Sequence, residues 1–239
     1  MSGFALKGAL VEFMPTSLPV PLPNVIVFQY NPETMTHTWT QPQPAPTAGT
    51  EQSNPLAVLG YPGEAFSFTI AMDANDEIAD GSAPTAALAE ASGIYSRLAA
   101  LEMLLYPTPP GQTGLTGAVS AAVAAGLAGL KTAATQKVPQ SVMPVTLFVW
   151  GAGRIVPVRV TGLTITEKLY DSALNPTHAE AQLALRVLTP AELVGASADN
   201  DVLGNLAMIA YTYTLSLRQK LAVANLGNAA ESIIGMIPH

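Results

Sequence analysis

The stretch VTLFVWGAGRIVPVRVTGLTITEKLYDSALNPTHAEAQLALRVL, residues 145–188, decides the fold. Its last ten residues alternate regularly between two sets of positions, as a strand with one buried face requires. The alternation predicts an inward-facing set made of Ala179, Ala181, Leu183, Leu185 and Val187. At the other end, VTLFVW and IVPVRV flank the glycine-rich GAGR, which predicts a β-hairpin. The NPTH segment then turns the chain into the final strand.

Further strands are predicted upstream of this stretch. EAFSFTIAMD, residues 64–73, alternates so that one face carries Phe66, Phe68, Ile70 and Met72. FALKGALVEF at 4–13 and NVIVFQY at 24–30 are two more strands. Four prolines in PTSLPVPLP, between those two strands, are expected to prevent sheet pairing there.

Two helical regions complete the prediction. Apolar residues recur every three or four positions from Leu88 to Leu105, after Ser82 and Pro84, which predicts a helix over about 84–106. Residues 111–137 form a low-complexity insertion. A second helix of five or more turns is predicted in a helical C-terminal extension, 191–239, with its packing partner open between the β domain and a neighbouring subunit.

Composition favours a chain whose surface is covered by other subunits. Hydrophobic residues make up 49% of the 239 residues and charged residues 11%, about half the usual share. The formal net charge of −7, with ten scattered Lys and Arg, argues against a nucleic-acid partner. The absence of cysteine excludes disulfides and thiolate chemistry. We expect neither a leader peptide nor a direct membrane span, because the longest apolar window, GLTGAVSAAVAAGLAGLKTAA, consists mostly of Ala and Gly.

Sites for catalysis, cofactors or metals are not predicted. The carboxylates of MDANDEIADG lack the spacing of a calcium loop, and a solvated turn before a helix is the simpler reading. These are Asp73, Asp76, Glu77 and Asp80. His37, His178 and His239 share no metal-ligand spacing. The nucleophile elbow G-x-S-x-G is missing, and GAGR lacks the third glycine of a dinucleotide loop. We therefore expect a protein that is not an enzyme.

The segment VFQYNPETMTHTW, residues 27–39, interrupts one strand and starts another. Asn31 and Pro32 set a turn, because Asn can bond its own backbone and Pro fixes φ and withholds a donor. Glu33 has no base, nucleophile or metal ligand near it in sequence. A structural corner is therefore predicted, which makes assembly the leading class of function.

Several segments, in this order, resemble the tube-like N-terminal domain of the baseplate adaptor family of contractile injection systems, which are phage-tail-like machines. They are LVEF, VFQYNPETM, the helix ending LEMLLYP, and the stretch 145–188. The family typically shows an F-x-[FY]-N-P-E motif at a corner and a later W-G … Y-D … P motif. The matching residues are Phe28, Tyr30, Asn31, Pro32, Glu33, Trp150, Gly151, Gly162, Tyr170, Asp171, Pro176 and Ala179. The resemblance covers about residues 4–190.

The resemblance implies an α+β fold: a tail-tube-like antiparallel β-barrel or sandwich over 1–190 with one flanking helix, followed by the helical extension. It implies a nonenzymatic subunit that joins the inner tube to the spike and baseplate as a hexameric ring. Such a subunit would be assembled in the cytoplasm and then become part of the injection particle. Many family members carry a LysM module, whose signature is missing after Pro190.

Two alternatives stay open. Within the same machine, the chain could be an inner tube or tube-initiator subunit. In another class, it could be a secreted-type β-sandwich binding module or hydrolase, which predicts a compact monomer with a polar-lined pocket.

Overall fold

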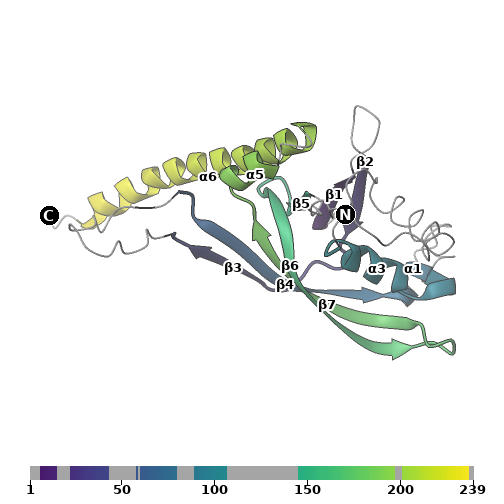
Figure 1. Ribbon diagram of the computed structural model, residues 1–239. Helices are drawn as coiled ribbons and strands as arrows, with labels where there is room; N and C mark the ends of the chain where they lie inside the picture. The colour runs from purple at the N-terminus through teal and green to yellow at the C-terminus, as the bar shows by residue number, and fades with distance from the viewer. Residues whose placement is uncertain are drawn as a thin grey trace, which may run out of the picture.

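The structure is a computed structural model, and it describes residues 6–14, 22–42, 58, 60–79, 89–106, 145–196 and 201–236. The low-complexity insertion predicted at 111–137 and His239 lie outside these residues. Within them, the chain forms one seven-stranded antiparallel sheet and several helices (Figure 1). The α+β prediction is therefore confirmed.

The strands lie in the order β2-β1-β5-β6-β7-β4-β3, and every neighbouring pair is antiparallel. Their bounds are β1 Ala9–Met14, β2 Leu22–Val27, β3 Met35–Thr40, β4 Gly63–Asp73, β5 Thr146–Val149, β6 Ile155–Tyr170 and β7 Pro176–Val187. The helices are α1 Ala74–Ala79, α3 Tyr95–Met103, α5 Pro190–Ala196 and α6 Asp201–Met236.

The stretch 145–188 forms the three consecutive strands β5, β6 and β7, as predicted. All five residues of the inward set on β7 are buried, and so are Phe66, Phe68, Ile70 and Met72 on β4. Pairing aligns the two buried faces, because Phe66 lies opposite Leu185 and Phe68 opposite Leu183. The period-2 pattern of each strand thus predicted its own core face correctly.

The sheet curls strongly around its core. Phe148 of β5 lies 5.2 Å from Phe66 and 5.5 Å from Phe68 of β4, between ring centroids. Two strands, β6 and β7, separate β5 from β4, so a flat sheet would hold these residues about 14 Å apart. Register shifts in β6, such as the one between Val160 and Gly162, allow the bend.

The curled sheet is not closed. In the described residues its outer strands, β2 and β3, each pair with a single neighbour and not with one another. The structure therefore does not confirm the predicted barrel. The concave face of the sheet carries the core, and α3 adds the buried side chains of Leu98 and Leu101 to it.

The second strand differs from its prediction. It was expected at 24–30, but β2 begins at Leu22 and ends at Val27, with Pro23 opposite Phe13. Proline is tolerated there because β2 is an edge strand, in which one side of the backbone needs no partner. Phe28 leaves the strand and is buried in the core.

The helix predicted over about 84–106 is interrupted in the described residues. The described residues 89–92 are helical and precede Gly93, whose φ of +56° ends that helical stretch, and α3 then runs from Tyr95 to Met103. A Cβ at Gly93 would lie 2.2 Å from the carbonyl oxygen of Pro176. The same oxygen accepts a hydrogen bond of 2.9 Å from the backbone N–H of Ile94. The break therefore fits the helix against the start of β7.

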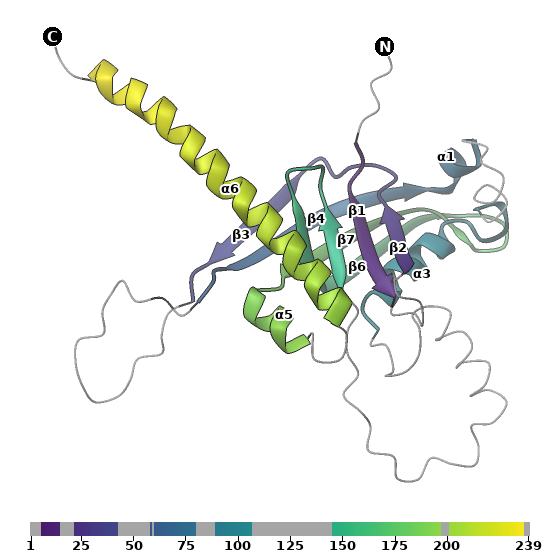
Figure 2. The same ribbon diagram turned by 90° about the horizontal axis from the view of Figure 1, so that it is seen from above.

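The long helix α6 has 36 residues and extends well beyond the sheet (Figures 1 and 2). Its first half packs through Ala207, Ala210 and Thr214, which are buried. From residue 219 to residue 226 every side chain is exposed. The helix thus lies on the β domain in its first half, and its side chains at 219–226 are exposed. In the described part of the chain, no helix combines the length and apolarity that crossing a membrane requires.

Candidate assembly site

The residues singled out by the resemblance fall into two groups in the structure. The first surrounds Gly8, where the rings of Phe28 and Trp150 lie 6.5 Å apart. A Cβ at Gly8 would lie 2.6 Å from the Trp150 ring and 2.8 Å from Phe28. The backbone just before β1 can therefore approach both aromatic rings this closely only because position 8 has no side chain.

Asn31 ties the corner after β2 to the start of β1. Its Oδ1 accepts a hydrogen bond of 2.8 Å from Gly8 N, and its Nδ2 donates one of 2.8 Å to Leu6 O. The side chain thus takes the place of a strand residue beside the backbone of residues 6–8. Tyr30 and Glu33, on the same corner, are exposed. A contact with another subunit at this corner stays a prediction.

The second group lies at the turn between β6 and β7. Asp171 accepts hydrogen bonds from Ala173 N (2.7 Å) and Asn175 N (2.8 Å), and these bonds shape the turn. Hydrogen bonds from the Asn175 side chain and backbone hold the pKa of the Asp171 carboxyl below its usual value. Pro176 begins β7 and anchors Ile94, as described above, whereas half of the Tyr170 side chain is exposed.

The structure does not bring the two groups together. Trp150 and Gly151 precede β6, and Tyr170 ends it, so the full 16-residue strand separates them, up to roughly 50 Å. Gly151 has a φ of +65°, as its place in the β5–β6 turn requires. Gly162 and Ala179 lie along the strands between these ends.

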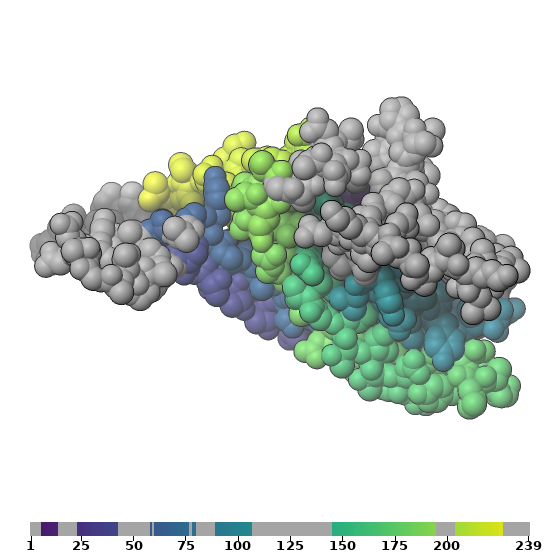
Figure 3. Space-filling view, in the orientation of Figure 1, coloured from purple at the N-terminus to yellow at the C-terminus, as the bar shows by residue number. Residues whose placement is uncertain are grey.

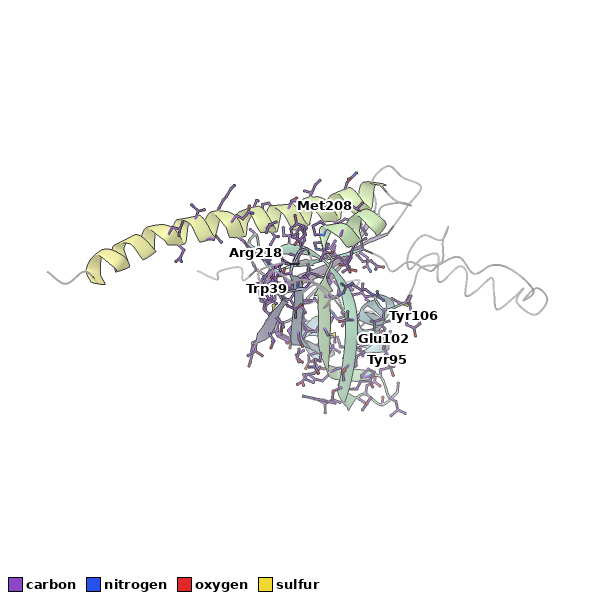
Figure 4. The ribbon with its side chains drawn as sticks, turned by 60° about the vertical axis from the view of Figure 1, so that its left-hand side comes forward. Trp39, Tyr95, Glu102, Tyr106, Met208 and Arg218 are labelled. Carbon is purple, nitrogen blue, oxygen red and sulfur yellow. The ribbon has the colours of Figure 1, made fainter. Side chains whose placement is uncertain are left out.

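A third set of residues, which the sequence analysis missed, joins α6 to the sheet. We name it the Glu64 clasp, and it consists of His37, Trp39, Glu64 and Arg218. Glu64 is 4% exposed. Arg218 Nη1 donates to Glu64 Oε2 at 2.9 Å, and Arg218 Nη2 to Glu64 Oε1 at 2.5 Å. The Arg218 guanidinium also lies over the Trp39 ring, 4.8 Å from its centroid (Figure 4).

His37 completes the clasp from β3. Its Nε2 lies 2.8 Å from Glu64 Oε1, and because a carboxylate only accepts, Nε2 is the nitrogen that carries the proton. Burial lowers the pKa of His37 below its usual value and outweighs the opposing effect of the Glu64 carboxylate. Arg154 and Arg218 lower that pKa further. His37 is therefore neutral at neutral pH, and its ring stacks on Phe66, with centroids 4.3 Å apart.

A second polar attachment fixes α6 to the β5–β6 hairpin. Thr214 Oγ1 accepts from Ile155 N at 3.1 Å and donates to Ile155 O at 2.6 Å. The Tyr213 hydroxyl donates to Ala152 O at 3.0 Å. Together with the Glu64 clasp, these bonds position α6 across two separate parts of the sheet.

The sequence held one signal for the clasp. The alternation of β4 places Glu64 on the same face as Phe66 and Phe68, and a charge on a buried face requires a partner. The identity of the partner was not predictable, because Arg218 is 154 residues away.

Asp73, His178 and His37, three of the residues considered as sites, find partners within the chain. Asp76 and Glu77 lie on α1 itself and not in a turn before a helix, and Asp80 lies outside the described residues. Asp73 ends β4, where its Oδ1 accepts from Asn75 N at 2.8 Å and its Oδ2 lies 3.2 Å from His178 Nδ1. Among the described residues, no three His, Asp or Glu side chains are grouped as metal ligands. The Glu64 clasp has both carboxylate oxygens occupied by Arg218 and is suited to holding α6 in place.

Several features of the described surface are exposed. The outer edge of β3 pairs with no strand in the described part of the chain. The edge at β2 is partly covered, since Arg97 of α3 donates to Val27 O at 3.4 Å. On α6, Leu221, Val223 and Leu226 are each more than 60% exposed. Such apolar exposure marks interaction surfaces.

Comparison with known protein families gives no match, and no curated protein is similar at a significant level.

Proposed function

We propose that this chain is a nonenzymatic structural subunit of a contractile injection system, a ring-forming adaptor that joins the inner tube to the spike and baseplate. The assignment to this machine rests on the ordered sequence motifs. The assembly role rests on one observation above all, which is the run of exposed side chains at residues 219–226 of α6, among them Leu221, Val223 and Leu226.

That exposed run of α6 favours assembly for an energetic reason. Each exposed apolar side chain that becomes buried contributes about 1.5–3 kcal/mol. A helix draws most of its stability from packing, and the side chains of residues 219–226 are all exposed. A neighbouring subunit would supply both the packing and the cover. The charged residues, 11% of the chain, support the same conclusion, because a soluble monomer normally covers its surface with a larger share of charged side chains.

The proposed assembly is a hexameric ring of tail-tube-like domains. The open edge of β3 would accept backbone hydrogen bonds from the adjoining subunit, so that sheets continue around the ring. The end of α6 would dock on a neighbour. Partners would be further copies of the chain, inner tube subunits, and spike and baseplate proteins, without nucleic acid. Assembly in the cytoplasm would precede incorporation into the particle.

Imaging of purified particles tests the proposal. An adaptor is expected at the junction between tube and baseplate, whereas a tube or tube-initiator subunit would appear along the tube or at its first ring. A β-sandwich binding module or hydrolase would be absent from the particle. Changing Asn31→Ala together with Pro32→Ala tests the corner, and unaltered particle assembly would exclude its role there.

A further inference from the structure

Two exposed helical surfaces of this chain have complementary chemistry. The first, the α6 arm, consists of residues 219–226. The second, the α3 stripe, consists of Tyr95, Ala99, Glu102 and Tyr106.

The α3 stripe is a continuous exposed ridge. Its members are spaced four, three and four residues apart, so they lie on one side of the helical segment (Figure 4). Tyr95 is 45% exposed and Tyr106 is 61% exposed, while the opposite side of α3 buries Leu98 and Leu101. The small side chain of Ala99 leaves room between the tyrosines for another helix to approach.

The α6 arm offers a matching surface. Lys220, Val223 and Leu226 are spaced three residues apart and lie along one side of the helix. Val223 and Leu226 are 66% and 65% exposed. Val223 and Leu226 lie roughly 4.5 and 9 Å along the helix from Lys220, and Ala99 and Tyr95 lie roughly 4.5 and 10.5 Å from Glu102. The two series therefore match in spacing when the helices run antiparallel.

Charge complementarity selects one surface for the other. Lys220 carries the single charge among residues 219–226, and Glu102 carries the single charge of the α3 stripe. Each charge lies beside exposed apolar or aromatic side chains. Placing Lys220 of one copy opposite Glu102 of another would pair both charges.

The two surfaces cannot meet within one molecule. The arm extends from one end of the sheet and α3 lies towards the other (Figures 1 and 3). Contact between two different surfaces of identical chains is heterologous, and it generates a closed ring when the rotation between copies permits.

We infer that the α6 arm of one copy docks antiparallel along the α3 stripe of a second copy, with Lys220 facing Glu102, Val223 against Ala99 and Leu226 against Tyr95. This contact rests on the proposed ring-forming function and names one of its interfaces.

Disulfide trapping tests the contact directly, because the chain has no cysteine of its own. Glu102→Cys and Lys220→Cys are prepared as separate full-length proteins and oxidised alone or mixed. The mixture is expected to give a covalent dimer, and each protein alone only the background level. A mixture of Lys220→Cys with Thr166→Cys, which is exposed on β6, serves as the control. Trapping at the level of this control would overturn the inference, as would equal trapping by either protein alone.

Charge reversal provides a second measurement. Glu102→Lys and Lys220→Glu are each expected to weaken self-association about fivefold, since an exposed ion pair becomes a like-charged pair. The double variant, which exchanges the two charges, is expected to restore it. Failure of the double variant to recover would contradict the pairing.

The outcomes separate this inference from the proposed function. Rings that form without trapping between positions 102 and 220 would overturn the inference and leave the ring-forming adaptor intact. A chain that stays monomeric at every concentration would overturn both.

Discussion

The guanidinium of Arg218 meets the buried carboxylate of Glu64 through two hydrogen bonds, and this pair joins α6 to the first residues of β4. From Gln219 to Leu226, immediately after Arg218, every side chain of the helix is exposed. The pair therefore marks the end of the docked part of α6 and sets the direction in which the exposed part extends.

Replacing Glu64 with Gln is expected to destabilise the protein by about 3 kcal/mol, because it leaves Arg218 and His37 without their shared carboxylate. Chemical denaturation measures the loss. Hydrogen exchange is expected to locate it in α6, with β4 and β7 still protected. Lys168→Met removes the partner of Glu180 in an exposed ion pair and serves as the control, with an expected loss of about 1 kcal/mol or less. Equal losses in the two variants would contradict the importance of the clasp.

Three glycines form a graded series for backbone strain. Gly153→Ala is expected to be neutral within about 0.5 kcal/mol, because its Cβ would meet open space. Gly151→Ala places an alanine at a φ of +65° where its Cβ meets no neighbouring atom, and it is expected to cost about 1 kcal/mol. Gly93→Ala combines a φ of +56° with the 2.2 Å approach to Pro176 O and is expected to cost most. Thermal unfolding of the three variants checks the order, and a Gly93 variant as stable as Gly153→Ala would refute the close packing of this break.

The strands were predictable where one face is apolar and the pattern is local. β4, β7 and the β5–β6 hairpin all follow from alternation and turn residues, because the alternation within a strand shows which of its faces is buried. The curl of the sheet was not predictable in this way, since it depends on contacts such as Phe148 with Phe66, 82 positions apart in the numbering. The break at Gly93 was also missed, because the apolar spacing continues through it.

The corner residues show a similar limit. The sequence indicated an interruption between two strands at Asn31 and Pro32, and these residues lie between β2 and β3. It did not indicate that Asn31 would bond the backbone of Gly8 and Leu6, more than twenty residues earlier. The Glu64 clasp was recognisable only as a charge on a buried face.

Asn31→Ala is expected to destabilise the fold by about 2 kcal/mol, because two hydrogen bonds to the backbone of residues 6–8 are lost at about 1 kcal/mol each. Denaturant titration measures the change. Glu33→Ala, on the same corner but exposed, is the matched control and is expected to stay within about 0.5 kcal/mol of the unchanged protein. If Asn31→Ala matched this control, the Asn31 bonds would not contribute to the fold.

His37 is expected to make stability depend on pH. Its pKa is lowered in the folded protein, mainly by burial, so the unfolded chain binds the proton more readily. Stability therefore increases with pH up to about 6.5, the ordinary value, and is lost as the pH falls below it. His37→Gln is expected to flatten this part of the profile.

NMR titration of the His37 ring checks the same claim. Its pKa is expected below 6.5 in the unchanged protein and lower still in Glu64→Gln, because the Glu64 carboxylate is the group that raises it. A His37 pKa above the ordinary value would contradict the dominance of burial.

The mass of the purified full-length chain in solution, measured by light scattering over a range of concentrations, tests the central claim most directly. The account predicts association into closed rings of six copies of the 24.8-kDa chain, visible by electron microscopy of the same sample. A single species of 24.8 kDa at every concentration would contradict it.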